Sequence, residues 1–557
     1  MSAHRHHDRR RLGGALLGIT LITAACAGSA TGTPAATTET GTSTPATSSA
    51  TTTDTASPGA ATTRADTHYD ATDLDWDAAS AVDITLADGA STVSGGGATV
   101  DGDTVTITTA GTYRVHGTLT DGAIVVAAGD GDQVKLVLDG ASITSSTAAA
   151  ITSSEADELV IILADGSTNS LSDAATHVDP GETSEVPVAA LASQTDLTIG
   201  GTGSLTVNGL VNDGISAKDG LVIASGTIAV TSVDDAVRGK DYLVVLDGAV
   251  TVQAGGDGLK SDEADDATLG YVAIAGGTLD ITATSDAIEA VSAVRVTGGT
   301  TTISAGDDGI HSEAALAVSG GTIDITGSVE GLEGTAITIS GGEINVVASD
   351  DGVNVAGDLP GEDDTTATDD ANGTGQEPGG FGGGGTEEAI EGWFLDVSGG
   401  TLVVTASGDA LDSNGATTIS AGTVVVNGST RGGGDGAFDT NGTLEISGGV
   451  VVGAGGITMG PGRGGSASTT QATISFDLDT QQPAGTVVQV RTTDGAVVLT
   501  YAPPVAYQRF VISTPDLVAG TTYEVFLGGT LQGESVGGLS LDAPASGGAS
   551  AGTVTAS

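Results

Sequence analysis

Between Asp213 and Asp409 the chain repeats a short phrase: a carboxylate, then Gly or Ala, then an aliphatic residue. The carboxylates follow one another in steps of 22, 22, 29, 22, 22, 21 and 58 residues. A repeat of about 22 residues is typical of a solenoid, in which each repeat buries its apolar face only against its neighbours. The carboxylates should then stack, and we call them the acid column: Asp213, Asp235, Asp257, Asp286, Asp308, Glu330, Asp351 and Asp409.

A second phrase, Ser-Gly-Gly-Thr or a variant of it, lies between these carboxylates and precedes an alternation of aliphatic and polar residues, as in Ser319–Thr326. Alternation with a period of two indicates a strand with one buried face, and the glycines indicate tight corners. We therefore predict an all-β fold, a right-handed parallel β-helix with about 22 residues per coil. A leucine-rich repeat fits poorly because Leu is sparse. The calcium-binding β-roll is an alternative, but neither its nine-residue period nor its Gly-Gly-x-Gly-x-Asp phrase occurs here.

Length and charge narrow the class of protein further. A chain of 557 residues exceeds a usual single globular core, whereas a solenoid can grow in one dimension. The formal net charge is -55, from 71 acidic and 16 basic residues. Such a surface repels nucleic acid and anionic lipid headgroups, so we expect no nucleic-acid partner and expect divalent cations instead.

The N-terminus predicts export. Several arginines precede an apolar run, Leu12–Ala25, that is too short to span a bilayer and is typical of a signal peptide. The run ends close to a bacterial lipobox at Cys26, the single cysteine of the chain, so we predict a lipoprotein signal peptide over 1–26 and lipid attachment at Cys26. The alternative is an ordinary secreted leader with an incidental cysteine. We expect an extracellular cell-membrane lipoprotein that touches the membrane only through this anchor.

Composition divides the rest of the chain. Residues 27–72, rich in Thr, Ala, Ser and Pro, predict a disordered stalk. We expect an N-terminal cap and first coils over 73–211, and regular coils over 212–465 with a Gly- and Asp-rich insertion at 358–392. A small C-terminal β module over 466–530 and a disordered tail over 531–557 complete the prediction, and we expect a monomer.

The acid column poses an electrostatic problem. Successive coils of a β-helix lie about 4.8 Å apart, and two unit charges at that distance repel by roughly 3 to 4 kcal/mol at an effective dielectric constant near 20. Several steps are doubled by a preceding acid, namely Asp234, Asp307 and Asp350. Calcium takes six to eight oxygen ligands in flexible geometry, so we predict bound Ca²⁺. The alternative is that these Asp residues form turns through hydrogen bonds from side chain to backbone.

A basic patch is expected beside the column. Arg238 and Lys260 stand three residues after column carboxylates, and Lys218 and Lys240 stand five residues after them. We predict that these four residues bind ligand, holding carboxylates of an acidic sugar polymer, or that a lysine serves as the base of a β-elimination. The alternative is that they only pair with nearby acids. We assign no catalytic residue, and we regard His311 as an edge residue or metal neighbour.

Four segments, Asp165–Asp173, Asp196–Gly203, Asp213–Asp219 and Asp234–Asp241, resemble a family of secreted bacterial carbohydrate-binding β-helix proteins similar in fold to polysaccharide lyase family 9. The resemblance implies several calcium ions at Asp-rich turns and binding of cellulose and acidic plant polysaccharides. It places calcium ligands at Asp213, Asp234, Asp235, Asp257, Asp286, Asp307 and Asp308. Later candidates are Glu330, Asp351 and Asp409, where Val329 and Gly408 interrupt the doubled acid, and Asp350 beside Asp351.

The sequence therefore predicts a cell-surface, calcium-dependent polysaccharide-binding protein. Two alternatives remain, a calcium-dependent polysaccharide lyase and a surface adhesin that binds no carbohydrate. The resemblance favours binding without turnover.

Overall fold

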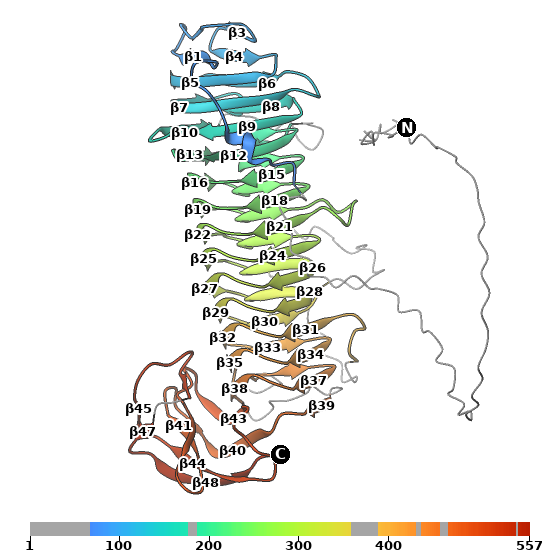
Figure 1. Cartoon of the computed structure of the whole chain (residues 1–557), viewed down its shortest axis with the longest axis vertical. Helices are drawn as coiled ribbons and strands as arrows, with labels where there is room; N and C mark the ends of the chain where they lie inside the picture. The colour runs from blue at the N-terminus through green and yellow to red at the C-terminus, as the bar shows by residue number, and fades with distance from the viewer. Residues whose placement is uncertain (1–66, 176–185, 358–387, 431–435, 457–465, 542–543) are drawn as a thin grey trace, which may run out of the picture. The chain divides into compact units, whose positions relative to one another are not determined.

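The structure, a computed structural model, describes residues 67–175, 186–357, 388–430, 436–456, 466–541 and 544–557 (Figure 1). The predicted signal peptide, Cys26, the stalk up to residue 66 and most of the predicted insertion lie outside the described residues. In the part that is described, no helix is long and apolar enough to cross a membrane. The regular structure there consists of strands and one short 3-10 helix, η2 (Ala71–Leu74).

Three lines of parallel strands make up the coils (Figure 1). Each strand pairs with the equivalent strand one coil earlier and one coil later, as in β16–β19–β22, β17–β20–β23 and β18–β21–β24. The prediction of an all-β parallel β-helix is confirmed. The first line contains β10 (Thr168–Asp173), β13 (Ser204–Gly209), β16 (Thr227–Ser232), β19 (Ala249–Gln253), β22 (Thr278–Thr282), β25 (Thr300–Ser304), β27 (Thr322–Ser328), β29 (Glu343–Ala348), β32 (Thr401–Ala406), β35 (Thr423–Asn427) and β38 (Val450–Gly455).

The other two lines follow the first in each coil. The second line contains β4 (Thr104–Ile107), β6 (Ala123–Ala127), β8 (Ile151–Glu155), β11 (Ala189–Ser193), β14 (Asp213–Ala217), β17 (Val237–Gly239), β20 (Leu259–Ser261), β23 (Ile288–Ala290), β30 (Val353–Val355), β33 (Leu411–Ser413) and β36 (Asp439–Thr440). The third contains β9 (Glu158–Leu163), β12 (Asp196–Gly201), β15 (Gly220–Ile223), β18 (Tyr242–Val245), β21 (Tyr271–Ile274), β24 (Ala293–Val296), β31 (Phe394–Val397), β34 (Ala416–Ile419), β37 (Thr443–Ile446) and β39 (Ser466–Thr469). Two longer strands, β26 (Ile310–Val318) and β28 (Leu332–Ile339), contribute to both lines.

The first coils are less regular. The long strands β5 (Gly111–Leu119) and β7 (Gln133–Ser145) pair in parallel with each other and with β1 (Val82–Leu86) and β9. Two short antiparallel pairs lie at this end, β1 with β2 (Thr92–Val93) and β3 (Ala98–Asp101) with β4.

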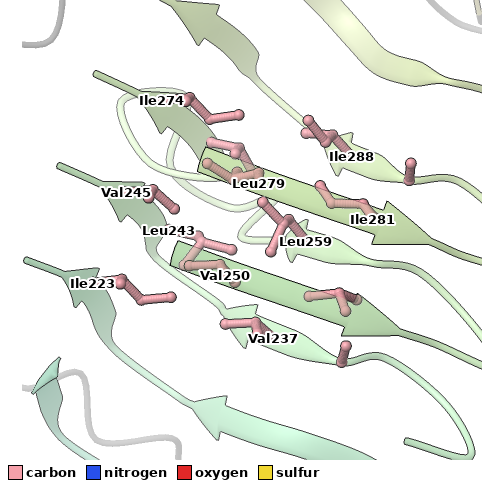
Figure 2. Close-up of a cluster of buried hydrophobic side chains, with 14 of the residues drawn as sticks. Ile223, Val237, Leu243, Val245, Val250, Leu259, Ile274, Leu279, Ile281 and Ile288 are labelled. Atoms are coloured by element: carbon pink, nitrogen blue, oxygen red, sulfur yellow. The ribbon is translucent and has the colours of Figure 1, made fainter. Parts of the chain in front are cut away.

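Aliphatic side chains from all three lines fill the interior of the coils. Residues at equivalent positions stack from coil to coil, so each Val, Leu or Ile is buried against the aliphatic residues of the coils above and below it. A fully buried side chain of this kind contributes about 1.5 to 3 kcal/mol of hydrophobic free energy. Figure 2 shows such stacks formed by Ile223, Val245 and Ile274, by Val237, Leu259 and Ile288, and by Val250 and Leu279.

Glycine is required at the corner before each strand of the first line. Gly299, before β25, has a φ of 85°, a conformation that other residues rarely adopt. A Cβ atom there would lie 2.9 Å from the carbonyl group of Gly276 on the preceding coil. The second glycine of the repeated Ser-Gly-Gly-Thr phrase thus permits the coils to approach each other closely.

Residues 67–76, here called the strap, lie across the outer face of the third line, where the sequence places the end of the stalk. That boundary is wrong for residues 67–72. Tyr69 and Leu74 pack against outward-facing apolar residues that include Val222, and Trp76 packs near Val160. These strands carry apolar side chains on both faces, and the strap removes the outer ones from water.

The C-terminal module is a five-stranded antiparallel sheet ordered β46 (Leu539–Ser540), β42 (Val497–Tyr501), β41 (Val488–Thr492), β44 (Thr522–Leu527) and β48 (Ala549–Thr555). β43 (Tyr507–Ser513) pairs on one edge with the last strand of the first line, β38, and on the other with β40 (Thr473–Gln482). A small pair, β45 (Thr530–Leu531) with β47 (Ala545–Ser546), lies beside them.

The prediction of a disordered tail over 531–557 is wrong. β48 pairs with β44 over most of its length, and the last residue, Ser557, exchanges backbone hydrogen bonds with Thr473. Ala556 is buried and Val554 packs against the core of the module. The tail has few apolar residues, and its order comes from backbone hydrogen bonds that complete the sheet.

Candidate functional site

The acid column lies at the turn where each coil passes from the first line to the second. In the middle of the column, one side-chain oxygen of Asp235, Asp257 and Asp286 accepts a hydrogen bond from the backbone N–H of the next column residue. The N···O distances are 2.9 Å from Asp257 to Asp235, 3.0 Å from Asp286 to Asp257 and 2.8 Å from Asp308 to Asp286. The turn-forming alternative thus describes one oxygen, Oδ1, of these carboxylates, while Oδ2 is left for other partners.

The same ladder continues more loosely toward the C-terminus. The N–H of Glu330 lies 3.3 Å from Asp308 Oδ1, and that of Asp409 lies 2.6 Å from Asp351 Oδ1. Burial is the main cause of raised carboxyl pKa values along the column. It raises the pKa of Asp213 to about 7, that of Asp308 to about 8 and that of Asp409 to about 9, and neighbouring carboxylates add to each shift. Ionised, these groups need cations close by.

A second row of side chains runs beside the column, three residues further along each coil. Parallel pairing places its members on consecutive strands of the second line, as in Arg238 beside Lys260, and His311 beside Glu333. We call it the flanking row: Ser216, Arg238, Lys260, Glu289, His311, Glu333, Asn354, Asp412 and Asp439.

Column and flanking row together form three groups in which one ligand atom per residue lies within 4.8 Å of the others. Every group takes two consecutive column residues and the flanking residue of the later coil. They are Asp257 with Asp286 and Glu289, Asp286 with Asp308 and His311, and Asp308 with Glu330 and Glu333. The predicted ligands Asp257, Asp286 and Asp308 are thus brought together.

Other predicted metal ligands are placed differently. Asp234, Asp307 and Asp350, the acids that double the steps, are exposed and belong to none of these groups. Asp213 and Asp235 are buried at the N-terminal steps of the column, and Asp351 and Asp409 at its C-terminal steps are at least half-buried, but none of the four is in a three-residue group. The sequence pointed to the column, including Glu330, but missed Glu289 and Glu333 as ligands. The available signal was their register three residues after column carboxylates.

The predicted basic patch is largely paired with acids. Arg238 forms an ion pair with Asp262, and Lys240 forms one with Glu263. Both acids belong to the 29-residue step of the column, between Asp257 and Asp286. Lys218 remains as a partly exposed cation, and burial, followed by the nearby Arg238 and Lys240, lowers its pKa.

Lys260, the fourth member of the patch, points into the column. Its Nζ lies 2.5 Å from Asp257 Oδ2, 2.6 Å from Glu289 Oε2 and 4.0 Å from Asp235 Oδ2. Although burial opposes it, hydrogen bonds to Asp257 and Glu289 raise the pKa of Lys260. An ammonium group thus occupies the place between carboxylates where a metal ion would bind.

Tyr242 and Tyr271, which stack on the third line, do not form an open platform for sugar. Tyr242 and Tyr271 stack with ring centroids 5.3 Å apart, and Arg295 lies over the Tyr271 ring at 5.4 Å. Only 8% of Tyr242 and 4% of Tyr271 is exposed, partly because His68 of the strap stacks on Tyr242. Polar and charged groups are therefore the available recognition elements of this region.

The residues of the column fit a calcium ion in their chemistry. Calcium prefers several carboxylate and amide oxygens, and the group Asp308, Glu330 and Glu333 supplies carboxylates only. Two buried oxygens nearby have no hydrogen-bond donor among the described residues, Asp213 Oδ2 at one end of the column and Asn354 Oδ1 toward the other. Buried oxygens are normally satisfied, so orphaned ones beside carboxylates are consistent with a cation.

Part of this chain is similar to known proteins. Residues 101–360 match the model of a family described as "Carbohydrate-binding domain-containing protein". A protein of the same description from Acetivibrio thermocellus is 40% identical over 126 residues, 23% of this chain and 44% of that protein, so this chain spans less than half of that relative's length. A solved structure described as a polysaccharide lyase-like protein from C. thermocellum, in a gadolinium derivative, is 33% identical, covers 43% of this chain and 96% of its own, and has a TM-score of 0.42. The part of the chain that carries the column from Asp213 to Asp351 is thus similar to a carbohydrate-binding domain family.

Proposed function

We propose that this protein binds polysaccharide at the cell surface, with cellulose or an acidic plant polysaccharide such as pectin as its ligand. The observation that carries the proposal is the match of residues 101–360 to a carbohydrate-binding domain family, because the matched region contains most of the acid column and the whole predicted basic patch. Binding is proposed for the protein as a whole, and turnover is not required.

Calcium is part of the proposal. Asp308, Glu330 and Glu333 would hold it, because one carboxylate oxygen from each of them lies within 4.8 Å of the others. A bound calcium ion supplies positive charge to a surface with a formal net charge of -55, on which a uronate polymer would otherwise be repelled.

The test is retention on polysaccharide. The mature protein is incubated with insoluble cellulose, and it is run through native gels cast with polygalacturonate, in calcium and in excess EGTA. We expect retention on at least one polymer in calcium and a clear reduction in EGTA. Lys218→Gln should weaken retention on polygalacturonate, whereas the control Arg491→Gln, in the C-terminal module, should not. Absence of retention on both polymers in calcium favours the adhesin instead.

A second function, a calcium-dependent lyase, is favoured by one observation. Lys218 has a lowered pKa, as a general base requires, while Lys240 and Lys260 are engaged in ion pairs. The absorbance of unsaturated uronides formed from polygalacturonate measures this activity. If product forms steadily and Lys218→Ala abolishes its formation, the protein is a lyase and the proposal of binding without turnover is wrong.

We also propose secretion and lipid attachment at Cys26. The proposal rests on the sequence of the leader, which lies outside the described residues. Cell fractionation tests it: the native chain should be found with membranes, and Cys26→Ala should move it to the medium. A variant that stays with the membranes contradicts the lipid anchor.

A further inference from the structure

Three cations of the predicted basic patch lie side by side on two consecutive coils. Lys218 and Lys240 each follow directly after the paired residues Ala217 and Gly239, so they occupy neighbouring coils about 4.8 Å apart. Arg238 stands two residues before Lys240, and this spacing puts both side chains on the same, outward side of the chain. The three cations can therefore contact successive carboxylates of a single polymer.

Two of these cations already hold carboxylates of the chain itself. Arg238 donates from Nε to Asp262 Oδ1 at 3.2 Å and from Nη2 to Asp262 Oδ2, a bidentate pair. Lys240 forms its ion pair with Glu263. Of the two basic side chains, 24% of Arg238 and 35% of Lys240 is exposed, so both pairs lie where a ligand from solution can reach them.

The two acids begin a loop that the coil does not need for closure. In the coils before and after, the connection between the second and the third line is two residues long, 240–241 and 291–292. Between β20 and β21 it comprises nine residues, 262–270, here called the acidic loop. A loop that exceeds what the fold requires is a candidate for a functional role.

Beyond its first two residues the acidic loop is loosely attached. Residues 264–268 are all exposed. The loop is stabilised by local hydrogen bonds, from the N–H of Asp265 to Glu263 Oε1 at 2.7 Å and from the N–H of Leu269 to the backbone oxygen of Asp266 at 2.9 Å. A segment with few buried contacts and exposed hydrogen bonds opens at low cost while the coils stay intact.

We propose that the acidic loop is autoinhibitory: its first two carboxylates occupy Arg238 and Lys240 in the place of the carboxylates of an acidic polysaccharide. A polyuronate contacts Lys218 first and then displaces the loop from the other two cations. Because its carboxylates are linked, the polymer competes with the loop at high effective concentration. The inference rests on the proposed binding of an acidic polysaccharide and adds a regulation of that binding.

Removing the two competing charges tests the proposal. Asp262→Asn with Glu263→Gln keeps the shapes of both side chains. The measurement is the polygalacturonate concentration that halves the mobility of the mature protein in native gels, relative to gels without polymer, at fixed free calcium. We expect this concentration to be about fivefold lower than for the native protein, since two partly exposed ion pairs no longer compete.

The matched control is Asp265→Asn with Asp266→Asn. It removes the same charge from the same loop at positions that form no ion pair with the patch among the described contacts. We expect less than a twofold change. Equal strengthening by both double variants shows general charge repulsion and overturns the inference, as does an unchanged affinity of the first variant.

Two further measurements tie the effect to the patch and to motion of the loop. Adding Arg238→Gln and Lys240→Gln to the first double variant should abolish its gain, and a gain that persists contradicts the proposal. Should that variant not fold, hydrogen exchange of the native protein remains decisive. Bound polygalacturonate should speed exchange at residues 265–269, whereas slower or unchanged exchange there contradicts displacement of the loop.

The outcomes separate this inference from the proposed function. If the native protein is not retained on polygalacturonate but the first double variant is, the loop masks the patch and the proposed binding of acidic polysaccharide by the native protein fails. If both are retained with equal affinity, the binding function stands and the autoinhibition fails. If neither is retained, the inference fails whatever the result with cellulose.

Discussion

At the scale of single residues, the strap is held by a buried polar cluster. His68 contacts Tyr242 Oη through Nδ1 at 2.7 Å and Thr198 Oγ1 through Nε2 at 2.9 Å. Its Nε2 is also 3.5 Å from Glu158 Oε1. Glu158 in turn accepts hydrogen bonds from Thr198 and from Gln133, at 2.7 Å each. An imidazole and a carboxyl group are therefore buried close to each other, and burial shifts the pKa of each.

The cluster predicts a compensated dependence on pH. Burial lowers the pKa of His68 from 6.5 to about 4, so its contribution to stability is complete above pH 6.5 and is lost as pH falls toward 4. Burial raises the pKa of Glu158 from 4.5 to about 7, so its contribution is complete below pH 4.5 and is lost as pH rises through 7. Between these limits the two effects oppose each other, and the native cluster should contribute little pH dependence.

Glu158→Gln removes one side of this balance. We expect the melting temperature of this variant to fall relative to that of the native protein as pH is lowered from 6.5 toward 4, because the titration of Glu158 no longer opposes that of His68. The double variant Glu158→Gln with His68→Gln is the control and should lose this additional acid sensitivity. Parallel melting curves of the single variant and the native protein across this range contradict the assignment.

Glycine next to the column predicts a steric effect. A Cβ atom on Gly258 would lie 2.5 Å from the carbonyl oxygen of Ala287, which the backbone of the next coil fixes. Gly258→Ala should therefore destabilise the protein by about 1 to 3 kcal/mol. In the control Gly131→Ala the new methyl group would meet nothing within 4 Å. Chemical denaturation measures the free energy of unfolding of both variants. Equal denaturation midpoints would contradict the predicted clash between neighbouring coils at Gly258.

Only some of the contacts between single residues could be predicted from the sequence. The register of the carboxylates identified the column and the flanking row, because a fixed period places equivalent residues on top of one another. It did not resolve which oxygen forms the turn, nor that Asp262 and Glu263 fold back onto Arg238 and Lys240. Those pairings join residues of an irregular step, where the period gives no information.

At the scale of elements, the strands of the coils followed from their alternation, whereas the way the solenoid ends did not. The first line carries Thr or Asp outward in its middle coils and changes to Val403 and Val425 in the last ones. The C-terminal module covers these valines, and Val425 belongs to its core. Where the outward-facing residues of the first line change from polar to aliphatic, the sequence predicts that another part of the chain covers them.

A side-chain hydrogen bond between fully buried groups joins the module to the coils, in addition to the backbone pairing of β43 with β38. The hydroxyl of Tyr501 in β42 donates to Asn427 Oδ1 in β35, and both residues are 0% exposed. Tyr501→Phe leaves that oxygen buried without its donor and should cost about 1 to 3 kcal/mol. Hydrogen exchange should show faster opening of β35 and β38 beneath the module.

Tyr507→Phe provides the matched control. Tyr507 is also buried, but its hydroxyl donates to the backbone oxygen of Thr486 at 2.8 Å, within the module. This variant should weaken the module without selectively loosening β35. Equal exchange patterns in the two variants would contradict a specific role of Tyr501 in coupling the module to the coils.

At the scale of the whole molecule, a period of about 22 residues was sufficient to predict the parallel β-helix. The strap and the ordered tail escaped prediction because their order depends on partners distant in sequence. The proposed metal binding also involves neighbouring coils together, because Asp286 and Asp308 each belong to two of the three candidate ligand groups.

Chelation should therefore lower global stability. A ligand present at a hundred times its dissociation constant stabilises the folded state by about 2.7 kcal/mol, and this contribution is lost when the ligand is removed. We expect a lower melting temperature in excess EGTA and recovery when calcium is restored. An unchanged melting temperature means that the column is stabilised by protons and side-chain cations alone.

Binding of polysaccharide in a calcium-dependent manner is the central claim. Its most direct test is a calorimetric titration of the mature protein with galacturonate oligomers, performed once in calcium and once in excess EGTA. The account predicts saturable binding in calcium that weakens at least about tenfold in EGTA, a loss of about 1.4 kcal/mol. No heat of binding in calcium, together with no retention on cellulose, would contradict it.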